Sequence, residues 1–176
     1  MRRIIPILLL AACSDSPSTT DASTTADAFD PARCLILGDY GAVGSLAATA
    51  GSNQGATTIT ATLDPGPPKD SFFIKLVPGN GAFIGGVAPG TYTISGVDAD
   101  YNNCGLCVHI IADIVASQGP SKFYFADAGT VTLTSTTPPI MGSAQGLHFA
   151  EVDINSGAPV AGGCQATMDS VEFATP

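Results

Sequence analysis

The chain of 176 residues contains no tryptophan and few basic residues, with 6 Lys and Arg against 15 Asp and Glu and a formal net charge of −9. The shortage of clustered Lys and Arg argues against nucleic acid as a partner, because phosphate binding depends on such clusters. Only 12% of the residues are charged and 45% are hydrophobic, which is enough apolar material for a folded core. We therefore expect one acidic domain that does not bind nucleic acid.

The hydrophobic runs are too short to span a bilayer, which needs about 20 residues. The run at residues 4–10 follows Arg2 and Arg3 and leads through two alanines to Cys13. This pattern resembles a bacterial lipoprotein signal, with residues 1–12 as the signal peptide and Cys13 as the acylated N-terminus. An ordinary secretory signal is the alternative. Ser14, where Asp would retain the protein at the inner membrane of enteric bacteria, implies a lipid anchor in the outer membrane of the cell envelope.

Residues 14–28 are built only from Ser, Thr, Asp, Ala and Pro. Such a segment has no large apolar side chains to bury, so nothing offsets the conformational entropy that ordering would cost. We expect residues 13–31 to form a disordered tether that begins at the lipidated Cys13. Residues 32–176 should form the folded domain.

Beyond Cys34 the chain contains only two Glu and three Lys and is rich in Thr, Val, Ile, Phe and Gly, a composition that favours strands. Apolar residues alternate with threonines at residues 58–63 and 130–134, which predicts one buried face for each segment. Further strands are predicted at three other places. These are residues 72–77, 91–94 and 122–125.

Turn signals rich in Pro and Gly separate these segments at short spacing, as at residues 64–68 and 78–81. Many short strands with regular turns predict an all-β fold, and we expect an antiparallel β-sandwich. Residues 41–57 show no clean period, so we interpret them as a loop with at most one weak strand. Near the C-terminus the apolar phase slips between Met168 and Val171, which predicts a bulge there.

Without Cys13, four cysteines remain, an even number that suits disulfide bonds in an exported protein. Three pairings are conceivable. We favour Cys34 with Cys164 and Cys104 with Cys107, because the first would join the beginning of the domain to its end. The pairings in which Cys104 and Cys107 have different partners stay open.

The sequence Cys104-Gly105-Leu106-Cys107 also has the spacing of a thioredoxin-like redox motif. Such a motif begins a helix, however, and residues 108–115 are dominated by β-branched and apolar side chains. We interpret the motif as a structural bridge at the start of a buried strand.

Asp98, Asp100 and Asn102 place oxygen ligands at alternate positions, as in the first half of a calcium-binding loop. The sixth position of such a loop is Asn103 instead of Gly, and the twelfth is His109 instead of Glu, which excludes an EF-hand. An irregular calcium site at the first three residues is one interpretation. An acidic turn between two strands is the other, and no other cofactor is expected.

The chain has two histidines, His109 and His148, that could serve as a catalytic base, and neither lies in a known motif. Residues 141–146 lack the glycine spacing of a nucleophile elbow around Ser143. We expect both histidines to be outward members of strands and the protein not to be an enzyme.

Strand, turn and cysteine motifs between Asp70 and Cys164 resemble those of a family of predicted lipoproteins from myxobacteria. They include residues 70–76, 79–83, 89–94, 101–107, 123–133, 149–152 and 163–164. The resemblance implies an envelope location and a β-rich fold, and it carries no activity or binding residues.

Two functions remain as hypotheses. The first is a non-catalytic surface or structural module that is held at the membrane by its lipid and contacts envelope partners. The alternative is a module that binds a glycan or matrix polymer through exposed rings that stack on sugars. In one form of this hypothesis, binding depends on calcium. The candidate rings are Tyr40, Tyr92, Tyr101 and Tyr124.

Overall fold

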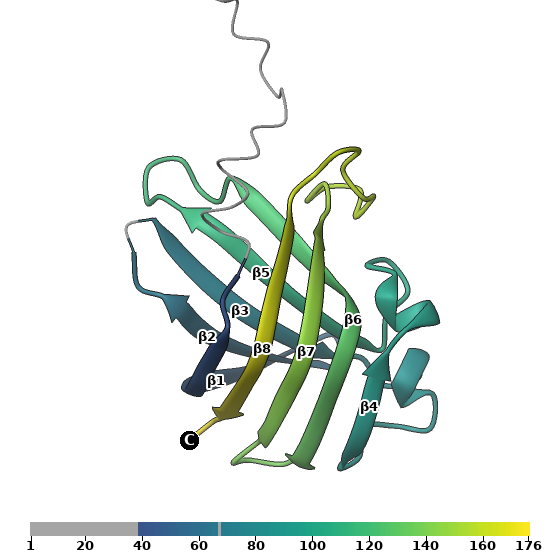
Figure 1. Cartoon of the computed structure of the whole chain (residues 1–176). Helices are drawn as coiled ribbons and strands as arrows, with labels where there is room; N and C mark the ends of the chain where they lie inside the picture. The colour runs from purple at the N-terminus through teal and green to yellow at the C-terminus, as the bar shows by residue number, and fades with distance from the viewer. Residues whose placement is uncertain (1–38, 67) are drawn as a thin grey trace, which may run out of the picture.

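The computed structural model describes residues 39–66 and 68–176. The predicted signal peptide, the tether, Cys13 and Cys34 lie outside the described residues. The described residues form eight β-strands and two short 3-10 helices, so the prediction of an all-β fold is confirmed (Figure 1). The elements are β1 (Ala42–Asn53), β2 (Ala56–Asp64), β3 (Lys69–Leu76), η1 (Gly81–Phe83), β4 (Gly90–Ile94), η2 (Gly96–Ala99), β5 (Leu106–Ile114), β6 (Lys122–Ser135), β7 (Met141–Glu151) and β8 (Gln165–Ala174).

The strands form one mixed sheet that closes into a seven-stranded barrel, and the expected antiparallel sandwich is wrong. The sheet order is β4-β6-β5-β3-β2-β1-β8-β7, and pairing of β6 with β7 closes it. β1 and β8 pair in parallel, whereas the other neighbours are antiparallel. Alternating strands suit a sandwich and a barrel equally, and only the long-range β1–β8 and β6–β7 pairings decide between them.

The long strand β6 pairs with three other strands, and one of them, β4, is not part of the barrel. Its first part pairs with β5 and its second part pairs with β4, while β7 lies along its other side. β4 therefore lies beside the second part of β6, outside the closed barrel (Figure 1).

The barrel interior is filled by every second side chain of the strands, as expected from their alternation. On β3 the inward set includes Phe72, Ile74 and Leu76, each at most 1% exposed. The predicted strands at residues 58–63, 72–77, 91–94, 122–125 and 130–134 all correspond to strands of the sheet.

Residues 41–57 are not a loop, which corrects our interpretation of this segment. They form β1 and its tight hairpin to β2, in which Gln54 and Gly55 both have positive φ angles (51° and 81°). Positive φ at both central positions suits a two-residue hairpin. The sequence shows no period here because most β1 side chains are small and exposed, with Ala48 as its buried residue.

The predicted change of phase in the last strand is present, since Met168 and Val171 are both buried. β7 changes phase at the opposite point, at Gly146 (φ 57°), so the β7–β8 register stays continuous. The register shift lies instead between β1 and β8, at Ala42 and Gly44.

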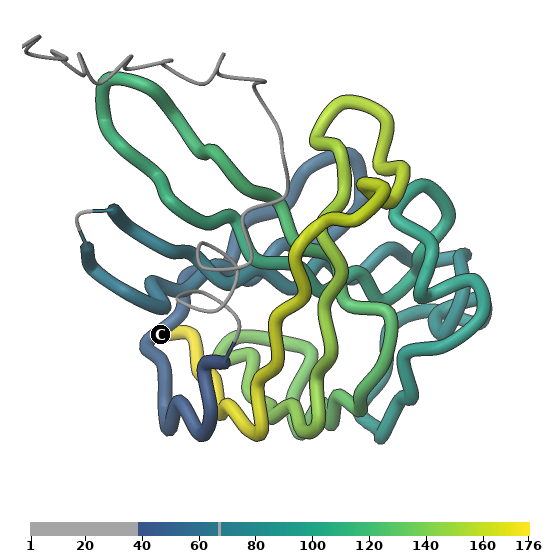
Figure 2. The backbone as a smooth tube through the Cα atoms, turned by 45° about the horizontal axis from the view of Figure 1, so that its top comes forward, coloured from purple at the N-terminus to yellow at the C-terminus, as the bar shows by residue number. Residues whose placement is uncertain are grey.

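Figure 2 shows the tip of the β5–β6 hairpin extending away from the rest of the sheet. Over residues 39–66 and 68–176, no helix is long and apolar enough to cross a membrane.

Candidate functional site

Outward side chains of β5 and β6 form a second apolar cluster, separate from the barrel core, and we call it the outer cluster. Its position explains why residues 106–112 read as an almost continuous apolar run, because a strand covered on both faces has no polar side. The buried members are Cys104, Cys107, Phe123, Phe125 and Val152, and Val77, Tyr101 and Ile111 pack against them.

Aromatic rings extend the outer cluster across three neighbouring strands. The ring of His109 on β5 is stacked on Phe73 of β3, with centroids 4.9 Å apart, and on Phe123 of β6 at 5.0 Å. Tyr101 meets Phe123 and Phe125 edge to face, at 5.6 and 5.5 Å. His109 is thus an outward residue of a strand, as predicted, and its ring serves as one layer of a stack.

The environment of His109 favours the neutral imidazole. Its Nδ1 atom is buried and has no hydrogen-bond partner among the described residues. Burial, with a smaller contribution from the charge of Lys75, lowers the pKa of His109 to about 4. A buried cation without a partner would be costly, so the ring is uncharged near neutral pH.

Cys104 and Cys107 form a disulfide bond at the start of β5, which confirms the predicted pairing and the structural bridge. The two cysteines are only 5% and 6% exposed. The motif leads into a strand and not into a helix, so the helix terminus that activates a thioredoxin-like cysteine is not present at this position. Cys164 is buried at the start of β8, and its predicted partner Cys34 lies outside the described residues.

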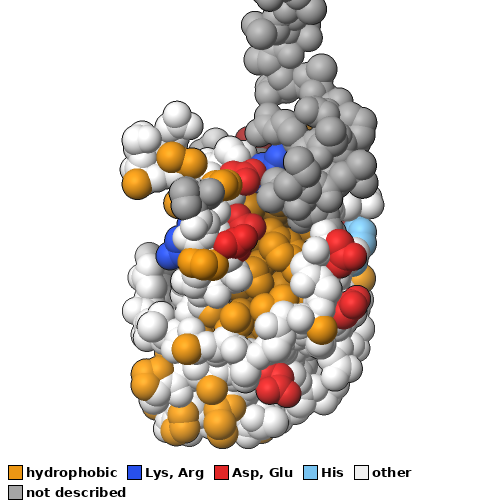
Figure 3. Space-filling model, turned by 60° about the vertical axis from the view of Figure 1, so that its left-hand side comes forward, with side chains coloured by type: hydrophobic (Ala, Val, Ile, Leu, Met, Phe, Trp, Pro, Cys, Tyr) orange, Lys and Arg blue, Asp and Glu red, His pale blue; other side chains and the backbone are white. Residues whose placement is uncertain are grey.

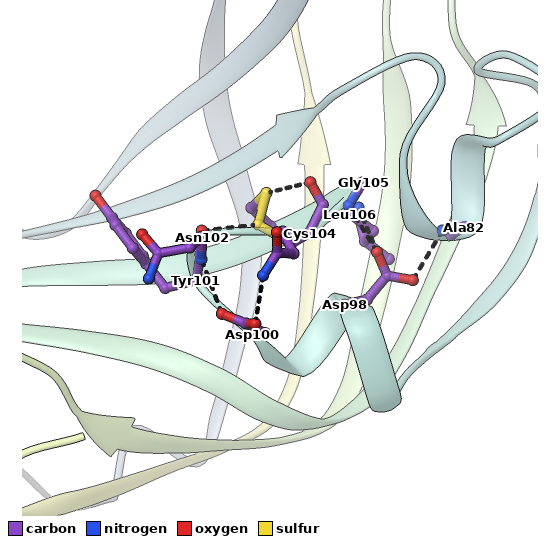
Figure 4. The surroundings of a disulfide bond; sticks show 10 residues. Ala82, Asp98, Asp100, Tyr101, Asn102, Cys104, Gly105 and Leu106 are labelled. Atoms are coloured by element: carbon purple, nitrogen blue, oxygen red, sulfur yellow. Dashed lines mark hydrogen bonds between the residues drawn. A yellow bond between two sulfur atoms is a disulfide. The ribbon is translucent and has the colours of Figure 1, made fainter. Parts of the chain in front are cut away.

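Asp98 connects residues 104–107, which we call the disulfide loop, to the neighbouring helix η1 (Figure 4). Its Oδ1 atom accepts hydrogen bonds from the backbone N–H groups of Gly105 (2.8 Å) and Leu106 (2.9 Å), and its Oδ2 atom accepts one from Ala82 (2.9 Å). The carboxylate is buried, and these three donors take the place of water.

The glycine of the Cys-Gly-Leu-Cys motif is required by the same packing. A Cβ atom on Gly105 would lie 2.0 Å from the carbonyl oxygen of Asn80, and one on Gly81 would lie 2.1 Å from Oδ1 of Asp98. Both glycines therefore allow η1 and the disulfide loop to approach closely.

The three predicted calcium ligands, Asp98, Asp100 and Asn102, each have hydrogen-bond partners within the protein, and calcium binding there stays a prediction. Asp98 lies in η2 and faces inward, whereas Asp100 has extended backbone and accepts from the N–H of Asn102 (3.0 Å) and from Nδ2 of Asn103 (2.6 Å). These bonds lower the pKa of Asp100, and the hydrogen bond from Asn103 has the largest effect. The amide of Asn102 donates to the carbonyl of Ser156 (3.0 Å). The acidic-turn interpretation describes this segment.

No group of three or more His, Cys, Asp or Glu side chains in the described parts of the chain is placed to hold a metal ion. The helix η2 is the reason that alternate oxygen ligands do not converge, since it rotates Asp98 away from the residues that follow.

Two polar pairs on the barrel surface have no local motif by which the sequence could have revealed them. Nδ1 of His148 lies 2.6 Å from Oδ1 of Asp127, and His148 is an outward strand residue as predicted. Nζ of Lys122 contacts both oxygens of Glu151 (2.9 and 3.0 Å), and Oε2 of that carboxylate also accepts from the N–H of Cys164. Each pair joins residues more than 20 positions apart.

A third polar group lies where β1 and β3 begin, and it too was missed. The hydroxyl of Tyr40 donates to Oδ2 of the buried Asp70 (2.9 Å), and the N–H of Asp113 donates to Oδ1 (2.9 Å). Burial, followed by the charge of Asp70, raises the pKa of Tyr40 well above its ordinary value. Tyr40 is therefore a neutral donor to a buried carboxylate.

The four candidate tyrosines do not form a shared platform. Tyr124 is 0% exposed and lies in the barrel core, while Tyr40 is bonded to Asp70. The hydroxyl of Tyr92 donates to the carbonyl of Ala88, and Tyr101 packs on the outer cluster.

Figure 3 shows apolar side chains gathered in a hollow on one side of the molecule, with acidic side chains around it.

An open groove of about 610 Å³ lies where β1 continues past the end of β8, and it is lined by residues 45–49 and 174–176. The lining side chains are small aliphatic and hydroxyl groups with one leucine, and they include no base, acid or metal ligand.

The aromatic stack on the outer cluster and the neighbouring carboxylate of Asp98 thus hold β3, β5, η1 and η2 together. This arrangement stabilises the outer face of β3 and β5. Comparison with known proteins found no matching family model, no similar curated protein and no similar solved structure.

Proposed function

We propose that the protein is a lipid-anchored, non-catalytic module of the cell envelope, attached through Cys13 and held away from the outer membrane by its tether. The observation that carries the non-catalytic part is the use of Asp98. Asp98 is a buried carboxylate next to the outer cluster, and both its oxygens accept hydrogen bonds from backbone amides. The stack around His109 is likewise closed by rings on both faces.

The anchoring part rests on the sequence of residues 1–13 and on the resemblance to predicted myxobacterial lipoproteins. The buried disulfide between Cys104 and Cys107 suits an exported protein, because disulfides persist in oxidising compartments. A disulfide-containing barrel attached through the predicted tether is well suited to contact with other envelope components.

The alternative, a glycan- or matrix-binding module, has less support. It depends on exposed rings that can stack on sugars, and the four tyrosines have separate contacts inside the fold or along its surface. A calcium-dependent version lacks a site at Asp98 and Asp100, whose oxygens accept hydrogen bonds from the chain itself.

The test is the intact mass of the protein extracted from its native membrane, measured without reduction and after thiol alkylation. The proposal requires loss of residues 1–12, added acyl mass on Cys13, and no alkylated thiol. Cys13→Ser should abolish acylation and release the protein from membranes, and Ser14→Asp should keep acylation and alter only the membrane in which the protein is found. An unacylated wild-type protein that is soluble after export would refute the proposal.

A further inference from the structure

β4 is an edge strand with an unpaired side. Its backbone pairs with β6 from Gly90 to Ile94, and no described residue outside β6 forms a backbone hydrogen bond with it. Figure 1 shows it at the end of the sheet, outside the closed barrel. An edge strand presents a row of unpaired N–H and C=O groups that can pair with another strand.

Charged side chains do not protect the edge of β4. Natural edge strands are commonly protected by charged side chains, Lys above all, and β4 has the sequence Gly-Thr-Tyr-Thr-Ile. The chain contains no Asp, Glu, Lys or Arg from Leu76 to Val97, and none from Ala128 to Ala150, a segment that includes the part of β6 paired with β4. β4 and the part of β6 paired with it thus form an uncharged surface in a chain of net charge −9.

Exposed apolar side chains lie in the two segments that flank this edge. Ile84, which follows η1, is 79% exposed, and Val97, within η2, is 53% exposed, the two highest values among the large hydrophobic residues described. The hydrogen bond from the N–H of Ala82 to Asp98 ties η1 to η2, so both side chains belong to one fixed unit beside β4. Exposed apolar side chains beside an open edge are typical of a protein interface.

We propose that β4 is a homodimer interface, in which the β4 strands of two copies pair antiparallel across a twofold axis and join the two sheets. Charge favours a second copy over a basic partner. Two copies of this acidic chain repel each other, and the repulsion is weakest where the uncharged surface of one copy faces that of the other. A basic partner, by contrast, would find no acidic side chain on β4 to attract it.

The strand is also complementary to itself. With the twofold axis at Tyr92, Thr91 of one copy lies opposite Thr93 of the other, and threonine pairs are favourable across antiparallel strands. The twofold arrangement is closed, so association stops at the dimer. This inference does not depend on lipid anchoring.

β1 has a second open edge, and we compare it with the edge of β4 as a possible site of dimerisation. β1 pairs with β8 up to Ala47 and with β2 from Ala48, so one side of residues 48–53 has no neighbouring strand in the sheet. Pairing of this edge with β4 of another copy would not be twofold and would produce chains longer than two.

The test is sedimentation equilibrium of the full chain, in density-matched detergent where the protein is acylated, over a range of concentrations. Wild type should reach twice the monomer mass and no more. Thr93→Lys places a charge on an exposed side chain of β4 and should raise the dimer dissociation constant by about tenfold or more. Ile84→Ser should weaken the dimer in the same direction.

Two matched variants separate this interface from others. Gln165→Lys adds the same charge to an exposed position on β8, which is separated from β4 by β6 and β7, and Thr49→Lys adds it at the open edge of β1. Both should leave the dimer unchanged, and circular dichroism should show that all variants are folded. A monomeric wild type, association beyond the dimer, a dimer that tolerates Thr93→Lys, or one disrupted by Thr49→Lys would each overturn the proposal.

Discussion

The imidazole ring of His109 lies almost parallel to the ring of Phe73, with 4.9 Å between centroids and 6° between planes. The two residues are partners in the β3–β5 ladder, so the stack is a cross-strand pair on the outside of the barrel. Pairs of this kind stabilise a sheet, and here one ring can acquire a charge that its surroundings do not accommodate.

The protein should therefore lose stability in mild acid. The pKa of His109 is about 4 in the folded protein and 6.5 in the unfolded chain, so between these values the unfolded chain binds the additional proton. The free energy of unfolding should fall as the pH is lowered from about 7 to about 4, by up to about 3 kcal/mol. Urea denaturation at a series of pH values measures this slope.

His109→Phe keeps a ring in the stack and removes the titration, so its slope over this pH range should be smaller than that of wild type. His148→Gln is the comparison, because it removes the other histidine, on the outside of β7 beside Asp127, and leaves the ring of His109 in its stack. Equal slopes for His109→Phe and wild type would contradict the assignment.

Removal of the Asp98 carboxylate should be strongly destabilising. In Asp98→Ala the N–H groups of Ala82, Gly105 and Leu106 lose their acceptor inside the protein, and we expect a loss of about 3 kcal/mol or more in the free energy of unfolding. Asp100→Ala is the comparison, since Asp100 is exposed and bonded only within its own turn, and its effect should be much smaller. Similar losses for the two variants in urea denaturation would show that the Asp98 contacts are not the cause.

The bond between Cys104 and Cys107 should contribute modestly to stability and be hard to reach. It closes a very short loop, so the double variant Cys104→Ala with Cys107→Ala should cost about 2 kcal/mol in the chain-entropy model. Because both cysteines are buried, a thiol reagent with mild reductant should label them in the unfolded protein and not in the native one. Rapid labelling of the native protein would instead favour disulfide exchange as a function.

The hydroxyl of Tyr40 should contribute more to the free energy of unfolding than the hydroxyl of Tyr92. Tyr40→Phe removes a donor from the buried carboxylate of Asp70 and should cost about 1 to 2 kcal/mol. Tyr92→Phe removes an exposed hydrogen bond to the carbonyl of Ala88, which water can replace, and should cost less. Thermal unfolding of the two variants gives the comparison, and the reverse order would show that Asp70 does not need this donor.

Local sequence determined the strands of this protein and the spacing of its breaks. Alternation at residues 58–63 and β-branched residues after Cys107 predict β2 and β5, because side-chain direction along a strand depends only on neighbours in the chain. The short separation of Cys104 and Cys107 likewise favours the bridge that is formed. β1 was not predicted because its side chains are mostly small and exposed, so apolar and polar residues do not alternate along it.

Tertiary structure decided how the strands are ordered and what each polar side chain does. The parallel pairing of β1 with β8 joins residues 127 or 128 positions apart. The local sequence of either strand is equally compatible with a sandwich. Asp98 could bind a cation or backbone amides, and the approach of η1 to the disulfide loop selected the amides. These outcomes depend on contacts between distant segments, whereas the periodicity of a sequence reports only which face of each segment is buried.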